Sequence, residues 1–160
     1  MNNTLVLMCG APGSGKTTIA KKLMCNNDLY ISRDEIRYSM ISDEDEYFSK
    51  EKEVFNEYIK QIDEALTKNY HWIFADATQL NEASRSKVLN QLKNKPNQTI
   101  VIYMTTSLEE TLKRNRQRTG RALVPDDVVK KMYKSMQKPT EKEKIDITFF
   151  SNGELCDRKE

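Results

Sequence analysis

The chain has 160 residues, the usual size of one domain, so the sequence predicts a single domain over residues 1–160 with one hydrophobic core. Hydrophobic residues make up 38% and charged residues 31% of the chain, which excludes a disordered or membrane-spanning protein. The formal net charge of +2 is too small to indicate a nucleic-acid partner, so only the positions of the basic residues can do so.

The three cysteines, Cys9, Cys25 and Cys156, are far apart and lack the paired spacing of zinc sites or disulfide scaffolds. The first residues lack the basic and apolar stretches of a signal peptide, and the apolar run from Thr4 to Cys9 is only long enough for a strand. These features predict a cytoplasmic protein without membrane contact. They do not indicate an oligomeric state.

Short apolar runs alternate with helical patterns, which is typical of an α/β domain with a mostly parallel sheet. Five strands are predicted, at Thr4–Met8, Leu29–Ser32, Trp72–Ala75, Thr99–Met104 and Ile145–Phe150. Apolar residues recur every three or four positions from Val54 to Leu66, which predicts an amphipathic helix that covers the sheet. The acidic run Asp43–Glu46 is interpreted as a solvated loop without a catalytic role. His71, which precedes the third strand, is predicted to be structural.

Two helices are predicted in the second half of the chain. Ser107 and Glu110 form a capping pattern that opens a helix running to Arg116, and Pro125 fits the start of the next helix. Residues 117–125 are therefore predicted to form a loop between them.

An eight-residue motif lies directly after the first strand and before a helical pattern. Gly10–Thr17 matches G-x-x-x-x-G-K-[ST] at every fixed position, which disfavours a chance glycine-rich turn. The glycines let backbone N–H groups point at phosphate oxygens, Lys16 reaches the β- and γ-phosphates, and Thr17 ligates Mg²⁺. ATP and Mg²⁺ are the predicted ligands. The predicted nucleotide-binding residues here are Gly10, Ala11, Pro12, Gly13, Ser14, Gly15, Lys16, Thr17 and Thr18.

The second strand ends in residues 32–37, Ser-Arg-Asp-Glu-Ile-Arg, at the edge where ligands bind in open α/β folds. Asp34 can take the proton of an attacking hydroxyl, and Arg37 can hold an anionic acceptor; a surface ion pair is the alternative. Asp76 ends the third strand, where it can steady Mg²⁺ through water or orient Arg37, with a turn cap as the alternative. Ala77 stands where a motor ATPase usually has Glu, which disfavours hydrolysis as the main task.

Five cations lie within nine residues of the second half of the chain: Lys113, Arg114, Arg116, Arg118 and Arg121. The helix dipole accounts for those at a helix C-terminus but not for those in the loop. The sequence therefore predicts an arginine-rich lid over about residues 113–125, from which one arginine stabilises charge on the γ-phosphoryl group. The alternative is a solvated basic face or a patch for an RNA backbone.

Taken together, the P-loop, the R-D-x-x-R element of residues 33–37, Asp76 and residues 113–136 resemble the kinase domain of the phage polynucleotide kinase-phosphatase family. The resemblance implies a three-layer P-loop kinase fold with strand order 2-3-1-4-5 and helices on both faces. It implies that Asp34 is the general base and that Arg37 engages the acceptor. It also implies that Arg118 contacts the ATP phosphates, and Arg114 is a nucleotide-binding candidate in the same lid helix.

The function implied by this resemblance is an ATP-dependent polynucleotide 5′-hydroxyl kinase for DNA or RNA ends, as used in nucleic-acid repair. Lys16 and Arg118 would stabilise the transferred charge. No Asp-x-Asp pair occurs in a phosphatase-like strand, so a kinase without the 3′-phosphatase is predicted. A phage-encoded protein acting in a host cytoplasm is compatible with it. Two alternatives stay open: a kinase for a nucleoside, sugar or antibiotic hydroxyl, and a nucleic-acid-binding NTPase, which would need no general base at Asp34.

Overall fold

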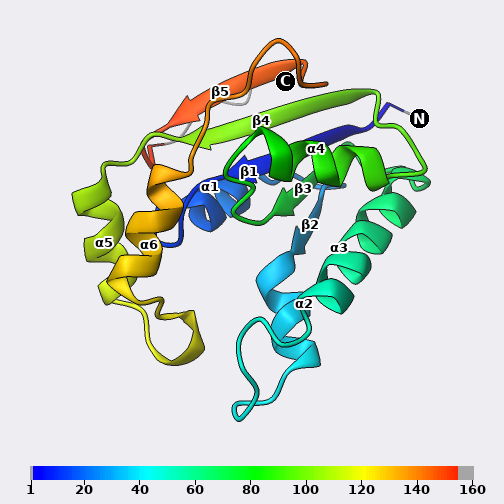
Figure 1. Ribbon diagram of the computed structural model, residues 1–160. Coiled ribbons are helices and arrows are strands. Elements are labelled where there is room, and N and C mark those ends of the chain that lie inside the picture. Colours follow the sequence, from blue (N-terminus) through cyan, green and yellow to red (C-terminus); the bar gives the residue numbers. More distant parts are fainter. Residues whose placement is uncertain (1, 155–160) are drawn as a thin grey trace.

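The computed structural model describes residues 2–154, which form a five-stranded sheet with helices on both faces (Figure 1). Cys156 lies outside the described residues. The elements in chain order are β1 (Thr4–Cys9), α1 (Lys16–Leu23), β2 (Leu29–Ser32), α2 (Arg33–Met40), α3 (Glu51–Leu66), β3 (Trp72–Asp76), α4 (Glu82–Gln91), β4 (Gln98–Met104), α5 (Leu108–Arg116), the 3₁₀ helix η1 (Gly120–Ala122), α6 (Asp126–Lys134) and β5 (Ile147–Ser151).

The strand order is β2-β3-β1-β4-β5, and all four neighbouring pairs are parallel. This confirms the predicted order. The predicted bounds hold for β2 and differ by one residue at one end of β1, β3 and β4, whereas β5 begins two residues later than predicted and ends one residue later, at Ser151. The short runs of Val, Ile and Leu suit strands that are buried on both faces, because helical crossovers cover a parallel sheet from both sides. The predicted α/β P-loop kinase fold is therefore correct.

The central strand β1 feeds two core layers through its alternating side chains. Leu5, Leu7 and Cys9 face the layer built with α2, α3 and α4, whereas Val6 and Met8 face the layer built with α1. Each of these five side chains has no exposed surface. The strand that leads into the P-loop is thus held by packing on both faces.

The carboxyl ends of the strands meet at one edge of the sheet. Met8 of β1, Ser32 of β2 and Asp76 of β3 lie in one row of the strand register, so the segments that follow these strands start side by side. In Figure 1, α2 stands on one side of this edge and α5 and α6 on the other. Exposed His71 precedes β3 and therefore lies at the opposite edge. None of the described helices is both long and apolar enough to cross a membrane.

Candidate active site

The P-loop has the backbone geometry of a phosphate cradle. Gly13 and Gly15 have φ angles of 89° and 91°, and a Cβ on Gly13 would lie 2.5 Å from the carbonyl oxygen of Thr111. Only glycine fits such a position. Among the described residues, the amides of Gly13, Gly15 and Lys16 donate no backbone hydrogen bond, so they are free to bind phosphate oxygens.

A hydroxyl and a carboxylate lie together next to this cradle. Thr17 Oγ1 donates a hydrogen bond of 2.6 Å to Asp76 Oδ2, and the Tyr30 hydroxyl donates to the same oxygen. Burial and the nearby Asp76 raise the pKa of Tyr30, which keeps its hydroxyl a donor. No three His, Cys, Asp or Glu side chains gather in a metal cage within residues 2–154. Thr17 and Asp76 fit a Mg²⁺ ion that arrives with nucleotide phosphates, because such an ion takes few protein ligands.

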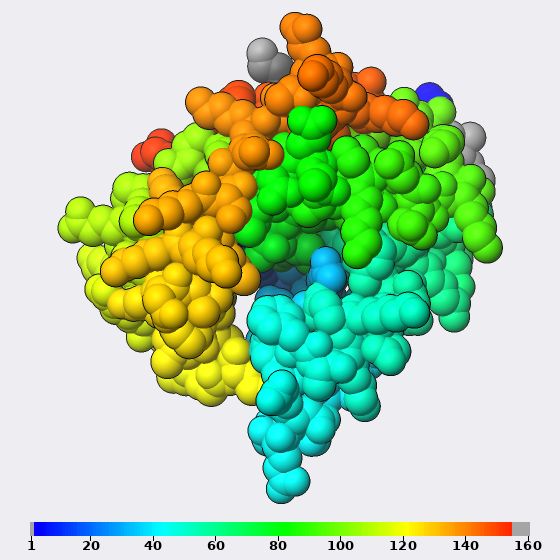
Figure 2. Space-filling model, in the orientation of Figure 1, coloured from blue at the N-terminus to red at the C-terminus, as the bar shows by residue number. Residues whose placement is uncertain are grey.

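A cavity of about 400 Å³ opens between the P-loop, α2 and the segment between α5 and α6. Figure 2 shows its mouth between residues 117–125 in yellow and the α2–α3 region in cyan. The structure brings six of the predicted site residues to its wall: Pro12, Lys16, Asp34, Arg37, Asp76 and Arg118. The predicted base therefore shares one space with the predicted phosphate-binding lysine.

Asp34 stands in the first turn of α2, which Ser32 caps by accepting a hydrogen bond from the amide of Glu35 at 3.2 Å. Asp34 Oδ1 accepts hydrogen bonds from Arg37 Nη1 at 2.6 Å and from the Tyr47 hydroxyl at 2.8 Å. Oδ2 has no partner among the described residues, and the side chain is 53% exposed. One carboxylate oxygen of this cavity-lining residue is thus fixed, while the other has no partner within residues 2–154.

Arg37 is buried, and each of its guanidinium nitrogens has a partner in the chain. Nε and Nη2 bind the Glu51 carboxylate at 3.2 and 2.9 Å, and Nη1 binds Asp34 and the Tyr47 hydroxyl. Burial opposes the charge, but Tyr47, Glu51 and Asp34 outweigh it and raise the pKa of Arg37. Glu51 also pairs with Arg33. The contact of Arg37 with an acceptor phosphate stays a prediction. For that contact, Arg37 would have to give up a hydrogen bond to Glu51, Asp34 or Tyr47.

The cations at the end of α5 do not all face the cavity. Arg114 Nη1 donates a bond of 3.3 Å to the carbonyl of Ser14 and lies beside Gly15, outside the cavity wall. Arg116 forms an exposed ion pair of 2.6 Å with Asp126. The two arginines predicted to bind the nucleotide, Arg114 and Arg118, therefore approach the P-loop region from different places.

Arg118 lines the cavity together with Lys16. Its hydrogen bond to the carbonyl of Ala122 is long, at 3.5 Å, and neither Arg118 nor Lys16 has a carboxylate partner within the described chain. These two cations are thus available for phosphate oxygens. Their roles in stabilising the transferred charge stay predictions.

Arg121 instead joins the loop to the opposite rim of the cavity. Its Nε forms an ion pair of 3.1 Å with Asp43, its Nη1 donates to the carbonyl of Ile41 at 3.3 Å, and its guanidinium lies 5.0 Å from the ring centre of Tyr38. The acidic run that begins at Asp43 does lie in a loop, as predicted. Asp43 and Asp45 of this run nevertheless line the cavity, which the interpretation as a solvated loop did not predict.

The loop between α5 and α6 is closed at its base by one buried side chain. Asn115 has no exposed surface, its Nδ2 donates to the carbonyl of Val124 at 2.6 Å, and its Oδ1 accepts from the amide of Val124 at 3.2 Å. The two ends of residues 116–123, which lie within the predicted lid of 113–125, are therefore held together at the base of the loop.

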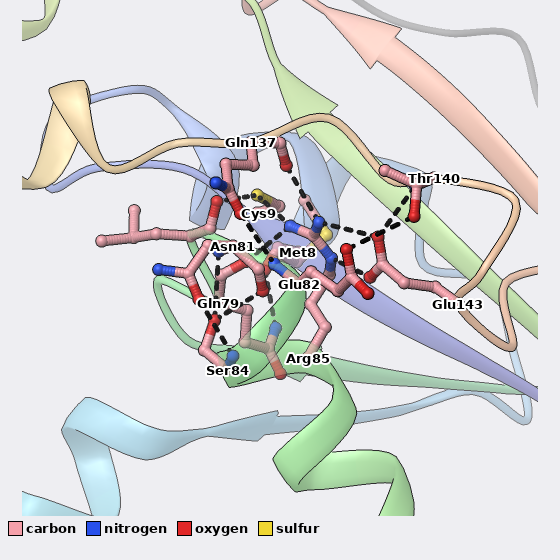
Figure 3. A network of polar contacts seen from close by, with 11 residues as sticks. Met8, Cys9, Gln79, Asn81, Glu82, Ser84, Arg85, Gln137, Thr140 and Glu143 are labelled. Atoms are coloured by element: carbon pink, nitrogen blue, oxygen red, sulfur yellow. Dashed lines mark hydrogen bonds and ion pairs between the residues drawn. The ribbon is translucent and has the colours of Figure 1, made fainter.

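A buried ion pair lies beneath the P-loop (Figure 3). The fully buried Arg85 binds the Glu143 carboxylate through Nε at 2.7 Å and Nη2 at 3.1 Å, and it also donates to the carbonyls of Gln79 and Gln137 at 3.2 and 2.9 Å. Its Nη1 reaches the sulfur of Cys9 at 3.5 Å. The network ties the segment after α6 to the last residue of β1.

The charges in this network are strongly affected by their surroundings. Burial works against the ionised form of Glu143, but hydrogen bonds from Arg85 and the Thr140 amide outweigh it and lower the pKa. Burial raises the pKa of the Cys9 thiol to about 11, so the thiol stays protonated at neutral pH. Sequence patterns missed this network because Arg and Glu side chains are almost always solvent-exposed.

Residues 5–139 match the model of a protein family described as an AAA domain. The chain belongs to this AAA domain family. The AAA domain is 28% identical over 153 residues to the L-seryl-tRNA(Sec) kinase of Methanococcus maripaludis, an alignment that covers 89% of the chain and 56% of the relative. The chain thus spans about half the length of this curated relative.

Two solved structures share the fold of the AAA domain. A chain of the Pnkp1/Rnl/Hen1 RNA repair complex superimposes with a TM-score of 0.70 at 20% identity, over 84% of this chain and 44% of that chain. A sugar kinase from Janibacter sp. HTCC2649 superimposes with a TM-score of 0.62 at 17% identity, over 92% and 84%. These likenesses agree with the α/β P-loop kinase fold of the chain.

Proposed function

We propose that this AAA domain transfers the γ-phosphoryl group of ATP to the 5′-hydroxyl at an end of DNA or RNA. The observation that carries the proposal is the position of Asp34, which shares a cavity with Lys16 and holds one carboxylate oxygen open to it. A general base beside a phosphate-binding lysine is required for transfer to a hydroxyl, but a simple NTPase does not need one at this place.

Bound ATP with Mg²⁺ would supply the γ-phosphoryl group and ADP as the leaving group. The free P-loop amides and Lys16 hold the phosphate oxygens, and Thr17, oriented by Asp76, provides the hydroxyl for Mg²⁺. Asp34 Oδ2 takes the acceptor proton while the acceptor oxygen bonds to phosphorus and the phosphorus–oxygen bond to ADP breaks. Arg118 stabilises the charge on the transferring group.

Arg37 takes a supporting role in this mechanism. It fixes Asp34 Oδ1 at 2.6 Å, and Glu51 in turn fixes Arg37, so the base is held in one orientation. Contact of Arg37 with a phosphate of the acceptor remains compatible with this role if the acceptor displaces one partner.

A nucleic-acid acceptor is supported by the resemblance to polynucleotide kinases and by the curated relative, which is named as a kinase of L-seryl-tRNA(Sec). The second candidate is a kinase for a small-molecule hydroxyl, because a sugar kinase shares the fold. The likenesses to the sugar kinase and to the chain of the RNA repair complex both show only the fold, so neither decides between the two candidates. We rank the small-molecule kinase second because the resemblance in the motifs favours a nucleic-acid acceptor.

The proposal is tested by incubating the protein with γ-labelled ATP and a panel of acceptors: DNA and RNA oligonucleotides with a 5′-OH, nucleosides, sugars and seryl-tRNA. We expect label on the oligonucleotide 5′ ends and its loss in Asp34→Asn. Label only on a nucleoside, a sugar or seryl-tRNA would show that the acceptor is that molecule and not a nucleic-acid 5′ end. ATP hydrolysis without any labelled acceptor would contradict the proposed kinase activity.

A further inference from the structure

An exposed aromatic ring lies on the acceptor side of the cavity. Phe48, in the loop between α2 and α3, is 56% exposed and lines the cavity wall. The Tyr47 ring packs edge to face against it at 4.7 Å between centroids, and the guanidinium of Arg37 lies 5.5 Å from its centre. Phenylalanine is usually buried, so a supported ring left open in a cavity offers a surface for a ligand.

The charges around this ring are already compensated. Arg33 and Arg37 both pair with Glu51, and Arg121 pairs with Asp43. Of the cations that line the cavity, only Lys16 and Arg118 have no carboxylate partner within residues 2–154, and both belong to the proposed phosphate-donor side. The wall beside Phe48 therefore suits a flat, uncharged group better than it suits a phosphate.

The ring is also connected to the proposed base. The hydroxyl of Tyr47, the residue next to Phe48, donates to Asp34 at 2.8 Å, so one short segment carries the aromatic surface and fixes the carboxylate. A nucleoside has the matching shape, because its ribose joins a flat base to the 5′-hydroxyl. A sugar without a base would leave Phe48 uncovered.

We propose that Phe48, supported by Tyr47 and Arg37, is a stacking site for the base of the acceptor nucleoside that carries the reacting 5′-hydroxyl. This inference rests on the proposed function and narrows it, because it makes the terminal base a binding determinant. Stacking accepts every base, since each has a π face, so the site selects for the presence of a base and not for its identity.

The test compares two 5′-OH oligonucleotides that differ only in whether the terminal nucleotide carries a base or is abasic. One stacked base is commonly worth about 5- to 150-fold in affinity, so we expect the wild-type protein to show a KM higher by such a factor for the abasic acceptor. Phe48→Ala should raise the KM of the normal acceptor similarly and leave that of the abasic acceptor nearly unchanged. Phe48→Leu should fall between them, and the KM for ATP should not change.

Phe149→Ala is the matched control. Phe149 is also an exposed phenylalanine, 40% exposed on β5, but it does not line the cavity. Equal use of both acceptors by the wild type, or equal loss with both in Phe48→Ala, would overturn the stacking site. If no oligonucleotide is phosphorylated, the proposed function fails separately. The same variants with adenosine and methyl riboside then decide the stacking site: a preference for adenosine that Phe48→Ala removes supports it, and equal use overturns it.

Discussion

The nucleotide half of the cavity is formed mainly by backbone, whereas the acceptor half is formed by side chains that hold one another. Gly13 and Gly15 give the P-loop its shape, and their free amides need no side-chain partner. On the other side, Asp34 depends on Arg37, which depends on Glu51. A local motif can therefore build the first half, while the second half requires several parts of the chain to come together.

This difference has a consequence for substrate range. A backbone cradle recognises phosphate in any nucleotide, so many P-loop proteins share it. The acceptor half can change its specificity through a few side chains of the loop between α2 and α3, such as Tyr47 and Phe48. Substitutions in one half at a time test whether the two halves of the cavity act separately.

The largest expected effect separates the two halves directly. Lys16→Ala and Asp34→Ala should each reduce phosphoryl transfer by at least roughly 10² to 10⁴-fold, since they remove a phosphate ligand and a general base. Calorimetry should show weaker ATP binding for Lys16→Ala and unchanged ATP binding for Asp34→Ala. Near-normal transfer by Asp34→Ala would disprove the base, and equal loss of ATP binding in both would disprove the division into halves.

Arg118 is expected to act on the transition state. Arg118→Ala should lower kcat on the order of 10³-fold with a much smaller change in ATP affinity, as for an arginine that stabilises developing charge. Arg118→Lys should not restore the rate fully, because lysine lacks the planar two-pronged donor. Arg116→Ala, which loses only an exposed ion pair with Asp126, is the control. Equal modest losses at both positions would indicate a diffuse basic patch.

The backbone character of the nucleotide half can be tested with two glycines of positive φ. A Cβ on Gly13 would meet the carbonyl oxygen of Thr111 at 2.5 Å, whereas a Cβ on Gly120 would meet nothing within 4 Å. Gly13→Ala should destabilise the fold by roughly 2–4 kcal/mol, and Gly120→Ala by about 1 kcal/mol for the backbone strain alone. Urea unfolding measures both. Equal costs would show that packing against α5 does not shape the P-loop.

The smallest effect concerns the network beneath the P-loop and depends on pH. The pKa of Glu143 is lower in the folded chain than its ordinary value of 4.5, so its stabilisation is complete above that pH and is lost as the pH falls through the folded pKa. Glu143→Gln should cost roughly 1–3 kcal/mol at pH 7 and progressively less as the pH falls through the folded pKa of Glu143. Asp126→Asn, in an exposed pair, should change the free energy of unfolding much less. A pH-independent loss in Glu143→Gln would contradict the assigned charge.

The sequence predicted the fold and the P-loop well because both depend on local patterns. Apolar runs mark strands buried on two faces, and the motif Gly10–Thr17 carries its own geometry. The order of the strands followed from the resemblance and is confirmed. The strands and the P-loop could therefore be predicted because each is specified by a short segment of the sequence.

The parts of the site that the sequence analysis did not predict are pairs of residues that lie far apart in the sequence. Glu51 lies 14 residues after Arg37, across a loop without periodicity, and no pattern links the two. Glu143 lies 58 residues after Arg85, and both look like ordinary surface charges in the sequence. The position of Glu51 in the first turn of α3, where carboxylates are favoured, was the one available signal, and it points equally to a helix cap.

The clamp between Asn115 and Val124 gives the loop over the cavity a thermodynamic advantage. The side chain and backbone bonds hold the two ends of residues 116–123 together before any substrate binds. Most of the loop-closure entropy is thus lost during folding and does not oppose substrate binding. In the proposed mechanism Arg118 therefore acts from a loop whose ends are already fixed, so less of the substrate's binding energy is spent on ordering that loop.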